Sequence, residues 1–321
     1  MAISNKSRTR QPKSAVAARR KGGGAPRAEP VAPFRDPWAE SKGRQALLSK
    51  IFDSLYATFG PQHWWPAGGS QLFDSGGRSG KEEAGSSHAP RAPALAPAKP
   101  DARFLPGAAM GSGGIGGATA PHGPPDSNAV FEIVVGAILT QNTAWTNVEK
   151  AIENLRSAGC LTPESLRGVS TERLAHLLRP SGYFNLKAER LKSFINFLYQ
   201  QYSGDLRRML GEEPHLLRQK LLRVKGIGPE TADSILLYAG GFPWFVVDAY
   251  TRRILSRHGL VADEVSYQGL QDFFMNNLPR DTKLYNEYHA LMVRLGKDVC
   301  RREPLCKQCP LLEVLGEPVH I

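Results

Sequence analysis

Two runs of apolar residues at helical spacing flank a glycine turn at positions 226–228. Before the turn stand Leu217, Leu221 and Val224, and after it stand Ala232, Ile235, Leu236 and Ala239. Spacings of three and four residues place each run on one helix face. The pattern predicts two helices joined by a very short loop.

Similar stripes occur along much of the chain, whereas no segment shows convincing strand alternation. A helix ending near Gly60 is expected to bury Leu48, Ile51, Phe52 and Leu55. Another is expected over 284–297, with His289 simply packed among apolar neighbours. The fold is therefore expected to be all-α.

Two segments lack the apolar residues that a core requires. The chain has 321 residues and a net charge of +11. Much of that charge lies in the basic tail at 1–40, which we expect to be disordered and to add DNA affinity or only solubility. The segment 68–127 is rich in Gly, Ala, Pro and Ser and is read as an exposed insertion. No apolar run is long enough to span a bilayer, so we expect a soluble intracellular protein of the cytoplasm or nucleoid, without membrane association.

A single carboxylate, Asp248, stands directly before the helical pattern AYTRRILSR, which a glycine at 259 ends. Aspartate is a preferred helix N-cap for reasons unrelated to catalysis. A capping role and a chemical role are compatible, because the carboxylate has two oxygens.

The glycine turn is a candidate phosphate-binding site. Gly226 and Gly228 permit positive φ and close backbone approach, and Pro229 suits the first position of a helix. Backbone N–H groups at such a helix start can hold a phosphate. The alternative is an ordinary corner between two helices.

These motifs, in this order, resemble the helix-hairpin-helix DNA glycosylases of the endonuclease III superfamily over roughly 128–310. The resemblance implies a two-lobed all-α fold with a cleft, and double-stranded DNA with damaged bases as partner of a monomeric enzyme. Asp248 would lie at the mouth of the base pocket. The implied DNA-binding residues are Gln141 and Tyr183 as wedges, Lys225, Gly226, Ile227 and Gly228 of the hairpin, and Arg252.

One departure bears on the reaction. Family members that also cut the strand carry a lysine two positions after the second hairpin glycine, and this chain has Glu230 there. A carboxylate cannot form the imine of a lyase. The resemblance therefore implies a monofunctional N-glycosylase of base excision repair. Lyase activity through Lys225 and a non-catalytic module that binds damaged DNA are the alternatives.

A tryptophan pair early in the chain indicates the substrate. Trp64 and Trp65 resemble a feature of the family subgroup that removes alkylated purines such as 3-methyladenine, and Trp145 is a further pocket candidate. Such bases are cationic and can stack on aromatic rings. Core packing is the alternative for each tryptophan.

Three cysteines near the C-terminus, Cys300, Cys306 and Cys309, resemble the 4Fe-4S loop of endonuclease III. Leu315 stands where the fourth family cysteine would be. The open alternatives are a cluster completed by an atypical ligand such as His320, a zinc site, or a loop without metal.

These features divide the chain into five expected segments: a basic tail at 1–40, a helix with the tryptophan pair at 41–67, the insertion at 68–127, a glycosylase domain at 128–297, and a cysteine loop with the C-terminal tail at 298–321.

Overall fold

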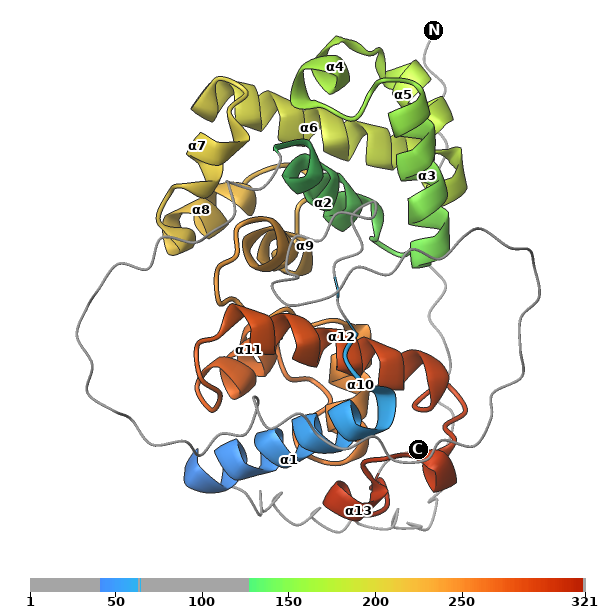
Figure 1. Cartoon of the computed structure of the whole chain (residues 1–321), viewed down its shortest axis with the longest axis vertical. Helices are drawn as coiled ribbons and strands as arrows, with labels where there is room; N and C mark the ends of the chain where they lie inside the picture. Colours follow the sequence, from blue (N-terminus) through green and yellow to red (C-terminus); the bar gives the residue numbers. More distant parts are fainter. Residues whose placement is uncertain (1–40, 63, 65–126, 320–321) are drawn as a thin grey trace, which may run out of the picture. The chain divides into compact units, whose positions relative to one another are not determined.

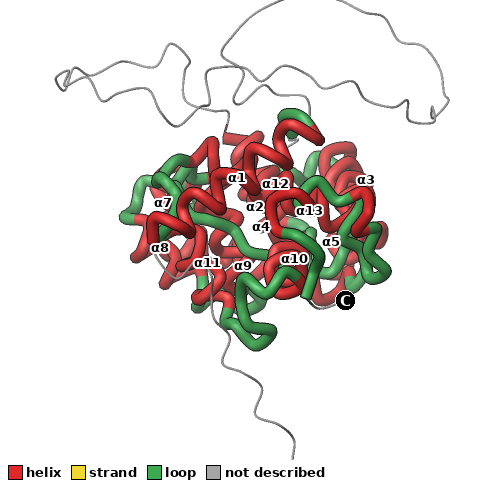
Figure 2. The backbone as a smooth tube through the Cα atoms, turned by 90° about the horizontal axis from the view of Figure 1, so that it is seen from below, coloured by secondary structure: helices red, strands yellow, loops and turns green. Residues whose placement is uncertain are grey.

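The computed structural model describes residues 41–62, 64 and 127–319. The expectations for the basic tail, for nearly all of the insertion, and for Trp65 and His320 fall outside these residues. Throughout the described part, every regular element is a helix, as Figure 2 shows. The prediction of an all-α fold is confirmed.

From α2 onward, the helices follow one another through short connections (Figure 1). They are α1 (Ser41–Phe59), α2 (Ser127–Leu139), α3 (Trp145–Ser157), α4 (Pro163–Gly168), α5 (Thr171–Leu177), η2 (Arg179–Ser181), α6 (Phe184–Tyr202), α7 (Leu206–Leu210), α8 (Pro214–Leu221), α9 (Pro229–Ser234), η3 (Ile235–Ala239), α10 (Ala249–Arg257), α11 (Tyr267–Met275), α12 (Thr282–Asp298), η4 (Cys306–Gln308) and α13 (Leu312–Leu315).

Helix α1 packs on α12 and α13, which are distant from it in the sequence (blue against red in Figure 1). The Tyr288 hydroxyl donates to the Leu48 carbonyl at 3.0 Å. Ser54 Oγ donates to the Pro310 carbonyl at 2.7 Å. The expectation that this helix docks onto the main helical body is confirmed.

Helix α2 is apolar around its whole circumference and is buried from Val130 to Leu139. It contacts α3, α6, α9 and η3. Its one buried carboxylate, Glu132, pairs with Arg156 at 2.8 Å. A helix that is apolar on every side is stable only inside a core, so α2 provides the surface on which the hairpin and its neighbours are assembled.

The chain between η3 and α10 is extended and runs through the core. Phe245 and Val246 are fully buried there. Gln271 Nε2 donates to the Phe245 carbonyl at 2.7 Å and to the buried carboxylate of Asp233 at 2.8 Å. Arg218 pairs with the same carboxylate at 2.5 Å. Because buried polar groups are costly unless paired, this network fixes the segment that ends at Asp248.

Among the described helices, none has the length and apolar character needed to cross a membrane.

Candidate catalytic and DNA-binding site

Asp248 is the N-cap of α10, as the sequence predicts. Its Oδ1 accepts a hydrogen bond from the Thr251 N–H at 2.7 Å. Its Oδ2 lies 3.8 Å from His289 Nε2, and the side chain is only 11% exposed. One oxygen is thus committed to the helix, and the second faces a buried histidine.

His289, on α12, is the site residue that sequence reasoning missed. Its Nδ1 is 2.5 Å from the Tyr238 hydroxyl, and its Nε2 is buried without a hydrogen-bond partner. Burial raises the pKa of Tyr238 well above its ordinary value, so the phenol keeps its proton and donates it to Nδ1. The ring proton of neutral His289 then lies on Nε2, directed toward Asp248.

The same histidine brings Trp64 to the site. The Trp64 ring centroid is 5.7 Å from that of His289 and 6.4 Å from that of Tyr238. Trp64 is half-buried, and it reaches the site through His289, whose Nε2 faces Asp248. Its predicted role in base recognition stays a prediction.

Trp145 makes its hydrogen bond within another helix, α3. It begins α3, and its indole N–H donates to Glu149 of the same helix at 2.7 Å. Helix α3 packs chiefly on α2, α5 and η2. The assignment of Trp145 to the base pocket stays a prediction.

Glu230, on α9, is exposed, yet the protein atoms around it remove part of its hydration. This desolvation, together with the negative charge of Asp248, raises the pKa of Glu230 to about 7. The two carboxylates make this part of the surface electronegative near neutral pH.

We expect the substitution Glu230→Gln to stabilise the protein more at pH 8 than at pH 5. A glutamate in the unfolded chain has a pKa of about 4.3, so the folded protein binds the extra proton between that value and about 7. The wild type therefore loses stability as the pH rises through this window, and glutamine removes the loss. Thermal unfolding at both pH values measures the difference. The exposed Glu164→Gln serves as control, and equal effects at both pH values would contradict the assignment.

In the hairpin between α8 and α9, only one of the two glycines has a positive φ. Gly226 has a φ of +89°, whereas Gly228 has an extended conformation with φ −94° and ψ 179°. The close approach of a phosphate to these two residues stays a prediction, and the space around them differs. A Cβ on Gly226 would stand 2.3 Å from Arg190 Cγ, but a Cβ on Gly228 would meet no protein atom within 4 Å. Ile227 between them is buried and anchors the turn.

Gly228→Ala is therefore expected to preserve the fold and to weaken DNA binding about tenfold or more, because a charged hydrogen bond to phosphate is worth roughly 1.5–3 kcal/mol. The matched control is Gly168→Ala at the end of α4, where a Cβ also meets nothing within 4 Å. Affinities for duplex DNA at several salt concentrations provide the measurement. Equal affinity of the two variants would count against a phosphate at the hairpin. Gly226→Ala is uninformative because its backbone conformation itself disfavours alanine.

Gln141 is attached directly to the hairpin. Its Nε2 donates to the Gly226 carbonyl at 3.1 Å and to Thr231 Oγ1 at 2.9 Å. Its Oε1 accepts a hydrogen bond from Arg190 Nη1. The structure therefore brings Gln141 and the hairpin together, as the predicted DNA-binding role requires.

Tyr183 is the most exposed large apolar side chain among the described residues, at 71%. It lies between η2 and α6 in a left-handed conformation, with φ 43°. An exposed aromatic ring held by an unusual backbone conformation is a common sign of a functional position. This placement agrees with the predicted wedge.

The loops that carry Gln141 and Tyr183 meet at a buried lysine, Lys187. Its ammonium donates to the Leu139 carbonyl at 2.8 Å and to the Ser181 carbonyl at 2.7 Å. Burial and the nearby Arg190 lower the pKa of Lys187 to about 8, so the amine is mostly protonated at pH 7. The sequence pattern contains no signal for this residue, because charged side chains are usually exposed.

Lys225 and Arg252, the two predicted cationic DNA contacts, differ in the contacts that they make within the protein. Lys225 is highly exposed and pairs loosely with Glu189 at 3.3 Å. Arg252 donates to the Val265 carbonyl, so part of its guanidinium is used within the protein. Both DNA contacts stay predictions.

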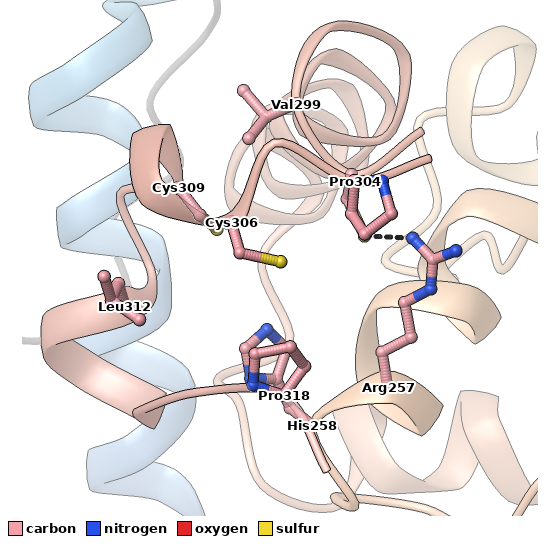
Figure 3. A pocket seen from close by; sticks show the side chains of 9 residues that line it. Arg257, His258, Val299, Pro304, Cys306, Cys309, Leu312 and Pro318 are labelled. Carbon is pink, nitrogen blue, oxygen red and sulfur yellow. Dashed lines mark hydrogen bonds between the residues drawn. The ribbon is translucent and has the colours of Figure 1, made fainter. Parts of the chain in front are cut away.

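The C-terminal cysteines line one small cavity (Figure 3). Its wall consists of Arg257, His258, Val299, Cys300, Pro304, Cys306, Cys309, Leu312 and Pro318. In the described part of the chain, no group of three or more His, Cys, Asp and Glu side chains is gathered tightly enough to hold a single metal ion. The expected metal-binding loop is therefore not shown.

Comparison with known proteins places the chain in a family. The model of the HhH-GPD superfamily base excision DNA repair protein matches residues 135–280. A candidate DNA repair glycosylase of Methanocaldococcus jannaschii is 46% identical over 185 residues, which are 57% of this chain and 84% of that protein. Endonuclease III of Thermotoga maritima is 29% identical over 180 residues, 56% of this chain and 79% of that enzyme.

Among solved structures, a non-covalent complex of endonuclease III with DNA has the same fold, with a TM-score of 0.51 and 24% identity over 58% of this chain and 82% of the other. The chain therefore belongs to the HhH-GPD DNA glycosylases of the endonuclease III superfamily and is a DNA repair glycosylase of base excision repair.

Proposed function

We propose that this glycosylase is monofunctional and removes an alkylated purine, such as 3-methyladenine, from double-stranded DNA. The observation that carries the proposal is the setting of Asp248, an oriented carboxylate that faces His289, with the Trp64 ring on the same histidine. Glu230, which cannot form an imine, stands where strand-cutting relatives have a lysine.

The reaction begins with extrusion of the damaged nucleotide, because its glycosidic bond is inaccessible within the stack. As that bond breaks, its electron pair leaves with the base and positive charge develops on the sugar. Asp248 stabilises this charge and orients a water, whose oxygen bonds to the sugar carbon while its proton is released. The Thr251 N–H holds the carboxylate in place, with His289 Nε2 packed 3.8 Å from its second oxygen.

The electrostatics of the site favour a cationic base. Asp248 and Glu230 lie close enough for the charge of one to raise the pKa of the other, and Trp64 offers an aromatic face. A purine alkylated on a ring nitrogen carries positive charge in DNA, which both features attract. Such a base also leaves readily, so little acid assistance is required.

The DNA would be held by the hairpin and by the two wedges. The phosphate approaches the open side of Gly228, with Lys225 and Arg252 as cationic contacts. Gln141, oriented by Arg190, fills the gap left by the extruded nucleotide, and Tyr183 enters the duplex beside it.

The test is a paired assay of the wild type on duplex DNA containing 3-methyladenine, with released base and strand breaks scored separately. Base release without breaks supports the proposal. Breaks without added alkali, together with borohydride trapping of a covalent adduct, would instead support the lyase alternative through Lys225. Binding without release from this lesion or from oxidised, deaminated and mismatched bases would favour a non-catalytic module.

The proposal includes a structural 4Fe-4S cluster held by Cys300, Cys306 and Cys309. Three thiols around one cavity supply the donor chemistry that such clusters require. The cluster would stabilise the C-terminal loop and has no part in cleavage of the glycosidic bond.

A further inference from the structure

We infer that His258 is the fourth protein ligand of this iron–sulfur cluster, which would give a site of three cysteines and one histidine. The inference rests on the cluster proposed above and is independent of the reaction at Asp248.

The first observation is the position of the ring. His258 follows the last residue of α10 and lines the same cavity as the three cysteines. Figure 3 shows the His258 ring and the Cys306 sulfur facing the same space. The Nδ1 atom of His258 is buried and has no hydrogen-bond partner. An unpaired buried ring nitrogen is costly, and coordination to iron would use it.

The second observation concerns Leu315, at the position of the fourth cysteine of the endonuclease III loop. Leu315 stands where relatives have the fourth cysteine, but it is absent from the cavity wall and packs against the hydrophobic core. Its hydrocarbon side chain cannot coordinate a metal. Among the described residues of the cavity wall, His258, which directly follows α10, carries a ring nitrogen able to serve instead.

A histidine ligand has a precedent in iron–sulfur chemistry. Each protein ligand of a 4Fe-4S cluster binds its own iron atom, and histidine replaces cysteine in known iron–sulfur centres.

The charge around the cavity suits an anionic cluster. Arg257 Nη1 donates to Cys300 Sγ at 3.4 Å. Arg257 also donates to the carbonyls of Arg301 and Arg302, at 2.6 and 2.9 Å. The end of α10 thus provides a guanidinium that stabilises thiolate charge and positions the loop, next to the proposed ligand.

The experiment compares anaerobically purified full-length proteins, reconstituted with iron and sulfide. The variants are His258→Ala, His258→Cys and the exposed control His176→Ala. Iron and sulfide per chain, visible absorbance and melting temperature are measured. We expect about four irons in the wild type, the control and His258→Cys. We expect His258→Ala to lose at least half of the iron and to melt at a lower temperature.

A second readout identifies the ligand atom itself. In protein labelled with ¹⁵N-histidine, pulsed EPR of the reduced cluster should show coupling to one strongly bound nitrogen, which disappears in His258→Cys. This variant also guards against misfolding, because it keeps a ligand at the position while removing the nitrogen.

The outcomes separate the two proposals. A wild type without iron, or with zinc alone, would overturn the cluster and this inference with it. A cluster retained unchanged in His258→Ala, or a spectrum without nitrogen coupling, would overturn the inference alone. Base release that depends on Asp248 is scored separately, so failure at either level leaves the glycosylase proposal standing.

Discussion

Replacing Asp248 by asparagine is expected to slow base release by about 10²–10³-fold, the usual cost of removing one preorganised electrostatic contact to a transition state. Asparagine is an equally good N-cap, so it can still accept the Thr251 N–H and preserve α10. The change removes the negative charge that the developing sugar cation needs. Single-turnover release of 3-methyladenine from duplex DNA measures the effect.

A matched control is available at the start of α12. Asp281 is also an N-cap aspartate, and its Oδ1 accepts the Leu284 N–H at 2.9 Å. Asp281→Asn should therefore leave the rate of base release unchanged. Unimpaired release by Asp248→Asn would remove Asp248 from the mechanism, and loss of release in both variants would indicate a structural effect. Affinity for duplex DNA should stay near the wild-type value in both.

The second large effect is expected from Lys187→Met, which should lower the free energy of unfolding by about 3 kcal/mol, since it leaves buried acceptors without a charged donor. Methionine keeps most of the side-chain volume, so the loss reports on the polar contacts. The same change releases the carbonyls of Leu139 and Ser181, which lie two residues before Gln141 and Tyr183, respectively. Urea unfolding measures the stability, and binding to duplex DNA should weaken at the same time.

Lys192, on the same helix, provides the comparison. Its ammonium donates to the carbonyls of Leu166 and Arg167, at 2.8 and 3.1 Å, but it is partly exposed and lies away from both wedges. We expect Lys192→Met to cost less stability and to leave DNA affinity unchanged. Equal effects of the two substitutions on DNA binding would contradict the special role of Lys187.

Local features of the sequence predict the parts of the site that depend on neighbouring residues. The hairpin follows from two apolar stripes around a glycine turn, and the capping role of Asp248 follows from its place before an amphipathic helix. The docking of α1 follows from a stripe of apolar residues that needs a partner. In each case the signal is contained in a few consecutive turns of chain.

The backbone conformation of the hairpin glycines does not follow from their residue type. Two glycines of one motif differ, since Gly226 is left-handed and Gly228 is extended. Glycine permits both conformations, so the sequence shows only that either is possible. The packing of Arg190 against Gly226 decides which glycine must remain without a Cβ.

The sequence by itself determined an all-helical chain, the hairpin, the aspartate at the start of α10 and the exchange of lysine for Glu230, because these depend on residue type and short spacing. Only the tertiary structure decided that His289 lies between Asp248 and Trp64, that Lys187 joins two distant loops, and that His258 shares a cavity with the cysteines. Those neighbours come from elements far apart in the chain. Helical periodicity shows which face of a helix is buried, but it does not show what that face will contact.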